Sequence, residues 1–503
     1  MKKKLFRGIC LILSMVTLIM LFGCELPSQG NTPGTEGGGE DHLSIRPAVY
    51  ITTPKDYVKF VRQDTSAAKV YDKSQLDESK GYVVTIDPNT TYQVVEGWGC
   101  AITESSAINL LDMPEETRNA VMKALFSEDD GIGLNLIRLP NGISDFSVDS
   151  NFSYAPVEGD LELEHFTLGK HKEMIVPLVL QAKHLINNDE DFKVFLASWT
   201  APLWMKTIPE FHSSNRSTLK REYYKLFANY LVKSIQAYEA EGIPIFSISP
   251  QNEFTGVHGI AAMYMSVDNM ATLINFYLKP ALDDAGLDTK ILAWDFNSFD
   301  DSTAIIGQTY QNIGVVGYHA YSGAFDLFKK NQELFPNLPF YVTEAAGMKQ
   351  APQSRFFRQM RWINDSMRVG SSGHILWNIV LDEEGGPALI DDKGQSVNTI
   401  GVGMLEWNRQ EKKVAYLEDF YALAHFSKFV RPGAVRVDST DLNETVGENV
   451  QNVVFKNENG AMTAVLTNND ASEHCFLLVI GDTVIECTVP GKSAATVTWK
   501  PNA

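Results

Sequence analysis

The chain has 503 residues, with 43 Lys and Arg against 62 Asp and Glu, so its formal net charge at pH 7 is −19. This acidic balance argues against a nucleic-acid partner, because such proteins carry basic surfaces, and against docking on anionic lipid through a basic face. With 44% hydrophobic and 21% charged residues, the composition is that of a globular protein. The length suggests two domains, or one large barrel with an accessory module.

Residues 1–24 have the pattern of a bacterial lipoprotein signal peptide. A basic start precedes an apolar run that is shorter than the roughly 20 residues of a membrane span. The run ends in Leu21-Phe22-Gly23-Cys24, which resembles the site where such peptides are cut before a cysteine that becomes lipidated. A plain signal peptide with a chance cysteine is the alternative.

Residues 25–43 are rich in Gly, Pro, Ser, Thr and acids, and this composition predicts a flexible tether. We therefore expect the folded body to lie outside the cytoplasm of a bacterium, at the cell surface or in the periplasm. Its only link to a membrane would be the lipid on Cys24, whose acyl chain binds through buried methylenes.

Two groups of short strands flank the central part of the chain, in residues 44–96 and 430–503. The runs contain β-branched residues and are separated by turn residues, which is typical of antiparallel β structure. We expect the two ends to build one β-sandwich together. Cys475 and Cys487 lie in the second group, and they could pair in an exported protein or remain two core thiols.

Between these groups, residues 97–429 alternate apolar strand-like runs with longer amphipathic stretches, such as 114–127 and 221–242. This alternation predicts a (β/α)8 TIM barrel, whose active site would lie at the carboxyl ends of the strands. A doubly wound α/β sheet is the alternative, but no G-x-G-x-x-G follows a first strand. The eight runs are 97–103, 134–142, 193–200, 244–253, 290–298, 314–323, 339–347 and 373–382.

Two glutamates are the main catalytic candidates. Glu253 and Glu344 lie in the fourth and seventh runs, directly after the apolar strand residues, where an acid costs solvation energy unless it is paired or used. Glycoside hydrolysis needs two carboxyl groups at the least. One must hold a proton, and the other must be ionised. Arg138, in the second run, could keep one carboxylate ionised. A salt bridge that closes the barrel is a compatible alternative for this arginine.

Four aromatic residues are candidate platforms for a sugar ring, because the C–H face of a pyranose lies flat on an aromatic ring. Trp199 and Trp377 end strands, and Tyr321 follows one, whereas Trp204 could equally be a core residue. The ten histidines are scattered, and the sequence has no C-x-x-C, no H-E-x-x-H and no P-loop. We therefore expect neither a metal nor a cofactor.

Taken together and in order, eight segments resemble glycoside hydrolase family 30, which includes glucosylceramidases and endo-β-1,6-glucanases. The resemblance runs from about residue 44 to the C-terminus. The segments are EGWGCAITESSA (96–107), LIRLPNGISDFS (136–147), ASWTAPLWMKT (197–207), SPQNE (249–253), YHAYSG (318–323), VTEAAG (342–347), LWNIVLDEEGGP (376–387) and FYALAHFSKFVRPGAVRV (420–437).

The resemblance implies a retaining mechanism, with Glu344 as the nucleophile and Glu253 as the acid/base. It also implies a (β/α)8 barrel joined to a β-sandwich made from both termini. Asn252 would meet the 2-hydroxyl of the bound sugar, and Arg138 would support the nucleophile. The full set of candidate substrate-binding residues is Arg138, Asp145, Trp199, Asn252, His319, Tyr321, Trp377 and Asn378.

The expected function is that of a lipid-anchored β-glycosidase whose substrate is a β-linked glucan, most readily a β-1,6-glucan cut internally. A glucosylceramidase or a β-xylosidase of the same family is the alternative among enzymes. A non-catalytic surface lipoprotein that binds glycans is the alternative from another class, although binding alone would need neither glutamate. The linkage, the choice between endo and exo attack, and the oligomeric state stay open.

Overall fold

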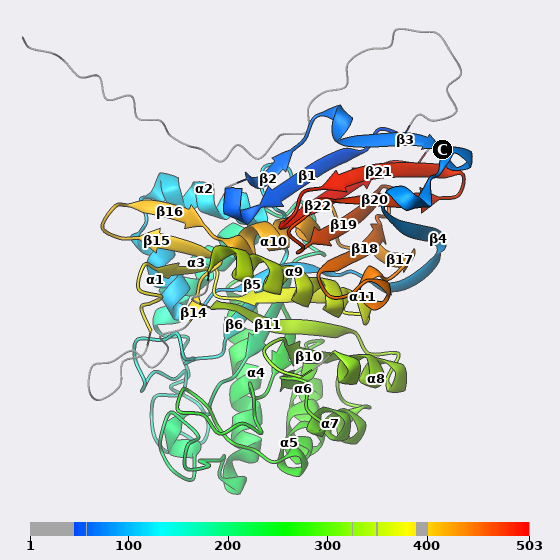
Figure 1. Ribbon diagram of the computed structural model, residues 1–503. Coiled ribbons are helices and arrows are strands. Elements are labelled where there is room, and N and C mark those ends of the chain that lie inside the picture. Colours follow the sequence, from blue (N-terminus) through cyan, green and yellow to red (C-terminus); the bar gives the residue numbers. More distant parts are fainter. Residues whose placement is uncertain (1–44, 57, 324, 349–350, 389–400, 502–503) are drawn as a thin grey trace, which may run out of the picture.

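The computed structural model describes residues 45–56, 58–323, 325–348, 351–388 and 401–501. Figure 1 shows two parts, a barrel surrounded by helices and a layered β structure packed on one side of it. The signal pattern of residues 1–24, with Cys24, and the tether of residues 25–43 lie outside the described residues, so both stay predictions. Among the described helices, none has the length and apolar content needed to cross a bilayer.

Eight parallel strands form a closed barrel, so the predicted (β/α)8 fold is confirmed. Each strand pairs with the next one along the chain, and the eighth pairs with the first. Strands buried on both faces are rich in Val, Ile, Leu and Phe, as parallel sheets require, and each falls on one predicted run. The strands are β5 (Gly97–Ala101), β6 (Leu136–Pro140), β7 (Lys193–Ala197), β8 (Ile245–Ser249), β9 (Lys290–Phe296), β10 (Val315–His319), β11 (Phe340–Met348) and β12 (Gly373–Trp377).

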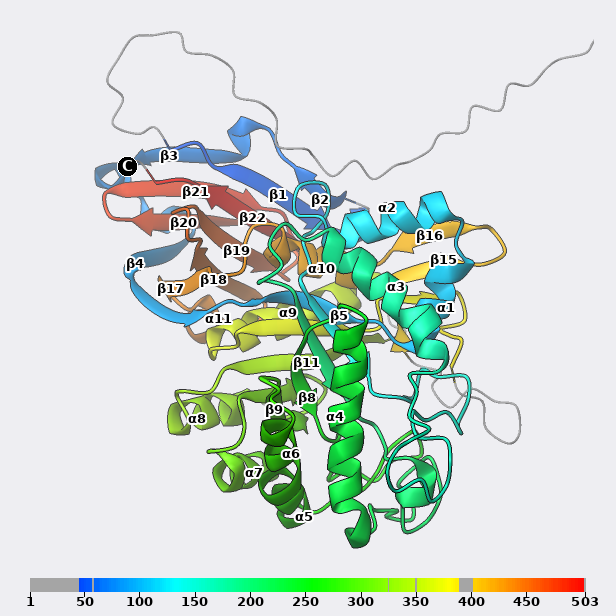
Figure 2. The same cartoon turned by 180° about the vertical axis from the view of Figure 1, so that it is seen from behind.

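Helices cover the outside of the barrel, as α4 in Figure 2 illustrates. Thr103 caps the first of them by accepting a hydrogen bond from the backbone N–H of Ser106. A π-helical turn, Ile274–Leu278, joins α5 to α6. The helices are α1 (Glu104–Asp112), α2 (Glu115–Phe126), α3 (Lys170–His184), α4 (Tyr224–Ala240), α5 (Val267–Leu273), α6 (Lys279–Asp284), α7 (Asp301–Thr309), α8 (Asp326–Leu334), α9 (Pro352–Arg368) and α10 (Glu418–Ser427).

A small three-stranded sheet lies between β12 and α10 in the sequence. The sequence pattern did not predict it. It contains β13 (Val380–Asp382), β15 (Leu405–Asn408) and β16 (Lys413–Tyr416). The short strand β14 (Gly401–Val402) pairs instead with the end of β11.

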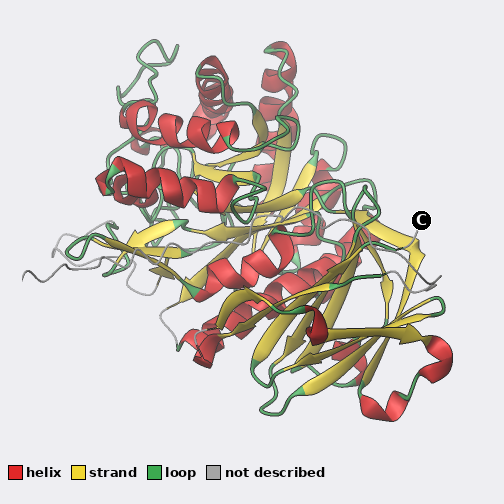
Figure 3. Cartoon of the chain, turned by 90° about the horizontal axis from the view of Figure 1, so that it is seen from above, coloured by secondary structure: helices red, strands yellow, loops and turns green. Residues whose placement is uncertain are grey.

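Strands from both ends of the chain form the second part, as predicted. They are hydrogen-bonded in the order β2-β1-β22-β19-β18-β17-β4-β20-β21-β3, so N-terminal strands form both edges and β4 lies among the C-terminal strands. Figure 3 shows this layer from above, beside the barrel. The strands are β1 (Ala48–Thr53), β2 (Val58–Arg62), β3 (Ala68–Asp72), β4 (Tyr82–Val94), β17 (Val435–Ser439), β18 (Val450–Lys456), β19 (Met462–Asn468), β20 (His474–Ile480), β21 (Thr483–Val489) and β22 (Ser493–Trp499); the short helix α11 is Leu442–Thr445.

The barrel and the sandwich share a hydrophobic core. Helices α9 and α10 lie between them (Figure 1), and Tyr50, Phe60 and Phe455 of the sandwich belong to the same buried cluster as the barrel residues. His425 of α10 bonds the sandwich hydroxyls of Thr52 and Thr496 through its two ring nitrogens. The sandwich therefore packs against one side of the barrel and stabilises it.

Cys475 and Cys487 are free thiols on the neighbouring strands β20 and β21. Cys475 pairs with Thr488 across the ladder, and Cys487 pairs with Phe476. Because successive side chains on a strand point to opposite faces, this register places the two thiols on opposite faces of the sheet. Of the two alternatives that the sequence leaves open, the structure therefore favours separate thiols.

Candidate active site

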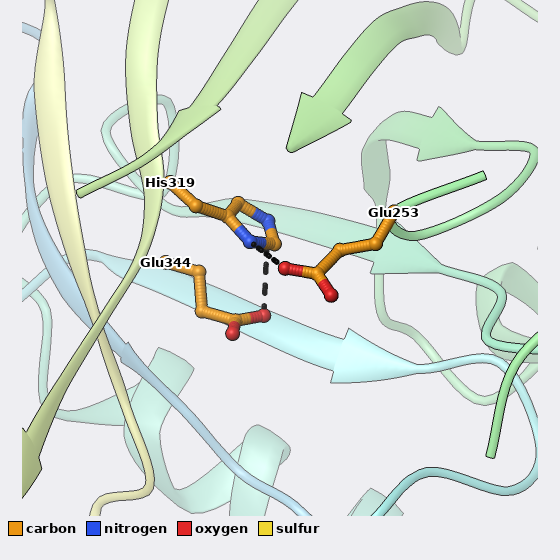
Figure 4. Close-up of side chains that lie close together, drawn as sticks. All are labelled: Glu253, His319 and Glu344. Atoms are coloured by element: carbon orange, nitrogen blue, oxygen red, sulfur yellow. Dashed lines mark hydrogen bonds and ion pairs between the residues drawn. The ribbon is translucent and has the colours of Figure 1, made fainter. Parts of the chain in front are cut away.

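Three titratable side chains converge at the carboxyl ends of the barrel strands. Glu253 follows β8, His319 ends β10 and Glu344 lies in β11. One oxygen of each glutamate and a ring nitrogen of the histidine all lie within 4.8 Å of one another. Figure 4 shows the imidazole placed between the two carboxylates. The structure thus brings together the two glutamates singled out in the sequence.

Glu344 receives two hydrogen bonds from residues predicted to lie beside it. Nη1 of Arg138 donates to its Oε2 at 2.5 Å, and the hydroxyl of Tyr321 donates to its Oε1 at 3.0 Å. Burial and the adjacent Glu344 carboxylate raise the pKa of Tyr321 well above its usual value, so the phenol stays protonated and remains a donor. The surroundings of Glu344 are those of an ionised carboxylate.

Arg138 is 1% exposed and serves three partners. Besides Glu344, its guanidinium donates to Oδ1 of Asn252 at 2.7 Å and to Oδ2 of Asp295 at 3.0 Å. Burial opposes its charge, but the carboxylates of Asp295 and Glu344 outweigh burial and raise its pKa. Arg138 is therefore a permanent buried cation.

The two tryptophans that end strands pack on this cation. Trp199 and Trp377 stack on each other with centroids 4.9 Å apart and an interplanar angle of 20°. The Arg138 guanidinium carbon lies 4.8 Å from the centroid of Trp199 and 5.4 Å from that of Trp377. Such cation–π contacts between buried groups help to fix the orientation of the guanidinium.

Asp295 is a central residue to which the sequence pattern assigned no role, although it lies at a strand end. It is fully buried. It accepts from Arg138 through Oδ2 and from the Thr343 hydroxyl, at 2.7 Å, through Oδ1. Although burial opposes ionisation, Arg138 and His319 hold the pKa of Asp295 well below its usual range. The available signal was an acid ending the apolar run 290–298, the same signal that identified Glu344.

Glu253 has different neighbours. Its Oε1 lies 2.9 Å from Nδ1 of His319, and its Oε2 lies 3.1 Å from Nε2 of His258. His258 lies in the loop after β8 and was also missed, because neither strand nor helix periodicity marks it. Its position depends on the path of that loop, which no local pattern encodes.

The carboxylates around His319 favour its protonated form. Burial opposes its charge, but Glu344, Asp295 and Glu253 together raise its pKa to about 10. Both ring nitrogens face carboxylates, since Nδ1 faces Glu253 and Nε2 lies 3.4 Å from Oδ1 of Asp295. The Glu253–His319–Glu344 cluster is therefore an ion-pair network.

Three further residues considered in the sequence differ in how they relate to this site. Asp145 is 6% exposed and contributes to the raised pKa of Tyr321, which places it near the site. Asn378 is buried and accepts a hydrogen bond from the Thr103 hydroxyl at 2.7 Å. Trp204 packs against the main core and donates to the carbonyl of Ala155, so a core role describes it.

The backbone is strained where these strands end. Glu253, Asp295 and Asn378 have φ angles of +50°, +57° and +64°. Left-handed angles are uncommon for residues other than glycine, and they cluster at functional sites, where the surroundings over-determine them. The strain therefore marks the same edge of the barrel as the charged network.

Comparison with known proteins gives a consistent result along the chain. Residues 95–430 match the Glycosyl hydrolase family 30 TIM-barrel domain, and residues 433–497 match the Glycosyl hydrolase family 30 beta sandwich domain. The lysosomal acid glucosylceramidase of Mus musculus is 27% identical over 454 residues, covering 84% of both chains. An endo-1,6-beta-D-glucanase of Neurospora crassa is 26% identical over 446 residues, covering 86% of this chain and 90% of the other. A solved endo-beta1,6-glucanase structure superposes with a TM-score of 0.80 at 27% identity and covers 91% of this chain and 100% of its own.

Proposed function

Because this chain belongs to glycosyl hydrolase family 30, we propose that it hydrolyses β-glycosides with retention of configuration, with Glu344 as the nucleophile and Glu253 as the acid/base. The observation that carries this proposal is the close approach of the two carboxylates, whose oxygens lie within 4.8 Å. Retaining glycosidases hold their carboxyl groups about 5–5.5 Å apart, whereas inverting enzymes need roughly 6.5–9.5 Å to admit a water.

The surroundings of each glutamate support these roles. Arg138 and Tyr321 both donate to Glu344, which suits a carboxylate that attacks the anomeric carbon. Glu253 faces imidazoles, which exchange protons near neutral pH in their ordinary state. Two carboxyl groups in unlike surroundings are the usual basis for separate acid and nucleophile roles.

In the first step a carboxylate oxygen of Glu344 forms a bond to the anomeric carbon while the glycosidic C–O bond breaks. The electron pair of that bond leaves with the glycosidic oxygen, which takes the proton of Glu253. In the second step water gives a proton to Glu253 and its oxygen displaces Glu344, which restores both carboxyl groups. Asn252, held by Arg138 at 2.7 Å, would meet the 2-hydroxyl of the sugar.

We propose that the substrate is a β-linked glucan, and that β-1,6 is the preferred linkage. A cleft of about 850 Å³ lies between α9 and the sandwich and is lined in part by Trp362, whose ring meets that of Tyr321 edge-on at 6.2 Å. Its walls carry acids, bases and five amide side chains, which suit the hydroxyls of a sugar chain better than the acyl chains of a glycolipid. The amides are those of Gln353, Asn443, Asn449, Gln451 and Asn469.

Product analysis on a panel of β-1,3-, β-1,4- and β-1,6-glucans, xylan and glucosylceramide tests the substrate. We expect oligosaccharides from the β-1,6-glucan. Release of glucose from glucosylceramide alone, or of xylose alone, would support the alternative activities and contradict the glucan proposal. Complete inactivity of the wild-type protein on every substrate would favour the glycan-binding alternative.

We also propose that Cys24 carries a lipid that holds the enzyme outside the cytoplasm, on the basis of its sequence context alone. Cys24→Ser should release the protein from the membrane fraction or leave the precursor uncut. A mature Cys24→Ser protein that still fractionates with membranes would contradict the anchor.

A further inference from the structure

A second imidazole lies against the acid/base candidate, at the carboxylate oxygen that His319 does not contact. Nε2 of His258 is 3.1 Å from Oε2 of Glu253, while Nδ1 of His319 is 2.9 Å from Oε1. The two histidines differ in exposure, since the side chain of His319 is fully buried and that of His258 is 25% exposed. The family mechanism described above assigns no role to His258.

The fold holds His258 in this place through its backbone. Its N–H donates to the hydroxyl of Ser213, and its carbonyl accepts from the N–H of Ser213 and from the hydroxyl of Ser214. These contacts tie the loop after β8 to the loop after β7. The ring also meets Phe296, at the end of β9, edge-on at 5.9 Å.

Gly256 leaves the space that the imidazole occupies. A Cβ atom on this residue would lie 1.9 Å from Nε2 of His258, well inside contact distance. The conflict would be with the end of a side chain and not with backbone, so the imidazole would move and the fold would remain. Only a glycine at position 256 is compatible with the observed contact.

We propose that His258 is a positioning residue that shares a proton with Glu253 and keeps the acid/base protonated to higher pH than the carboxyl would manage alone. This inference rests on the proposed function of Glu253. Nε2 of His258 is buried and has no hydrogen-bond partner among the described residues, although Oε2 of Glu253 lies only 3.1 Å away. When Glu253 is protonated on Oε2, a turn of the neutral imidazole would align Nε2 to accept that hydrogen bond. When the proton moves, the O–H bond breaks and an N–H bond forms, so the pair retains the proton.

The charges around the pair explain why a second partner is needed. Protonated His319 faces Glu253 from β10, and Arg138 on β6, Asp295 on β9 and Glu344 on β11 lie behind it. An imidazolium in contact with a carboxyl group favours its ionised form, which opposes the role of general acid. A neutral imidazole whose hydrogen is on Nδ1 can only accept at Nε2, and in that tautomer it favours the protonated form of Glu253. Among the described residues whose contacts are given, Glu253 is the one charged partner of His258.

The test is the pH dependence of kcat/KM for the wild type and three variants. His258→Gln keeps a hydrogen-bonding group but cannot titrate, and Gly256→Ala keeps the imidazole but displaces it. His212→Gln is the matched control, because its side chain is similarly exposed, at 26%, and pairs with Glu210 instead. The substrates are the phenyl and 2,4-dinitrophenyl glycosides of the sugar that the substrate panel identifies.

With the phenyl glycoside, the basic limb of the profile should move to lower pH by about one unit in both His258→Gln and Gly256→Ala, and should not move in His212→Gln. With the 2,4-dinitrophenyl glycoside, whose leaving group needs no proton, all four proteins should share one basic limb. Activity on the 2,4-dinitrophenyl glycoside also shows that each variant is folded and active.

Two results would overturn the inference: a His258→Gln profile that superposes on the wild type, or an equal shift with both substrates. If Glu253 is not the acid/base, the results differ from both of these. The wild type itself would then show no basic limb with the phenyl glycoside, or Glu253→Ala would retain full activity.

Discussion

The two candidate catalytic carboxylates lie within 4.8 Å of each other, yet their surroundings differ in kind. Glu344, in a barrel strand, is held by Arg138 and Tyr321, which keep their protons at every pH of interest. Glu253, just beyond a strand, is held by the imidazoles of His319 and His258. The surrounding carboxylates raise the pKa of His319 to about 10, whereas the side chain of His258 is 25% exposed and has Glu253 as its charged partner. Fixed donors suit a permanent anion, and an imidazole that can accept a hydrogen bond suits a group that gives up and regains a proton.

These different surroundings indicate that the role of each glutamate is set by the type of side chain around it and not by its position at a strand end. Both acids end apolar runs, and so does Asp295, which is also buried. Asp295 contacts Arg138, His319 and Thr343, so it supports the charged partners of both glutamates.

Removing the glutamates should give the largest effects, and the two losses should differ in kind. Glu344→Gly should lose activity on every substrate, because no covalent bond to the sugar can form. Glu253→Ala should lose about 10²–10⁴-fold on substrates with poor leaving groups, the usual contribution of a general acid, but much less on 2,4-dinitrophenyl glycosides. Steady-state kinetics measures both, and equal losses on the two substrate types in Glu253→Ala would contradict the division of roles.

Arg138→Met should destabilise the fold as well as abolish activity. It leaves Asp295 and Glu344 buried without their cation, which costs about 3–5 kcal/mol when a buried pair loses one member. Urea denaturation measures the loss. The control is Arg361→Met, whose side chain is 51% exposed and pairs with Asp365 and Glu448; it should cost less than about 1 kcal/mol. Equal stability losses in the two variants would argue against a buried charge network.

His319 should make stability depend on pH on the alkaline side. Its pKa rises from 6.5 to about 10 on folding, so its contribution is complete below about pH 6.5 and is lost as the pH rises through 10. One proton gives a slope of at most about 1.4 kcal/mol per pH unit. Denaturation between pH 6 and 10 should show a shallower decline for His319→Gln than for the wild type. His184→Gln, at the exposed end of α3, should keep the wild-type slope, and an unchanged slope in His319→Gln would contradict the assignment.

Thr343→Val should have the smallest effect, because it removes only the hydroxyl, which donates to Asp295 and lies 3.3 Å from the carbonyl oxygen of Tyr318, and preserves the side-chain shape. The lost bond joins the threonine hydroxyl to Oδ1 of Asp295 at 2.7 Å, and we expect a cost of about 1 kcal/mol with a modest fall in kcat. Thr90→Val removes a bond of equal length to Asp87 at the surface and should cost less than about 0.5 kcal/mol. Equal costs would mean that the Asp295 contact adds nothing by being buried.

Much of the fold could be predicted from the sequence, because hydrophobic patterns are local. The barrel strands fall on the eight apolar runs, and helix α4 (Tyr224–Ala240) falls within the predicted 221–242. The exceptions have physical causes. Short strands were predicted within residues 44–96, but β4 has 13 residues and continues through Pro88. Its pairing with β17 is irregular there, and such irregularities tolerate proline.

The site could be predicted in part. Glu253, Glu344 and Arg138 follow from strand ends and from the cost of burying charge, which a sequence reveals. Asp295 carried the same signal and was left out, because its role depends on contacts with three other strands. His258 carried no signal, since only the packing of one loop on another brings it to Glu253.

Azide rescue of the two glutamate variants tests the central claim most directly. The anomeric configuration of each glycosyl azide formed from a β-glycoside is read by proton NMR. If Glu344 is the nucleophile, Glu253→Ala should give the β-azide, by attack on the covalent intermediate, and Glu344→Gly should give the α-azide, by direct displacement. The same anomer from both variants, or the two anomers exchanged, would contradict the assignment of the two carboxylates.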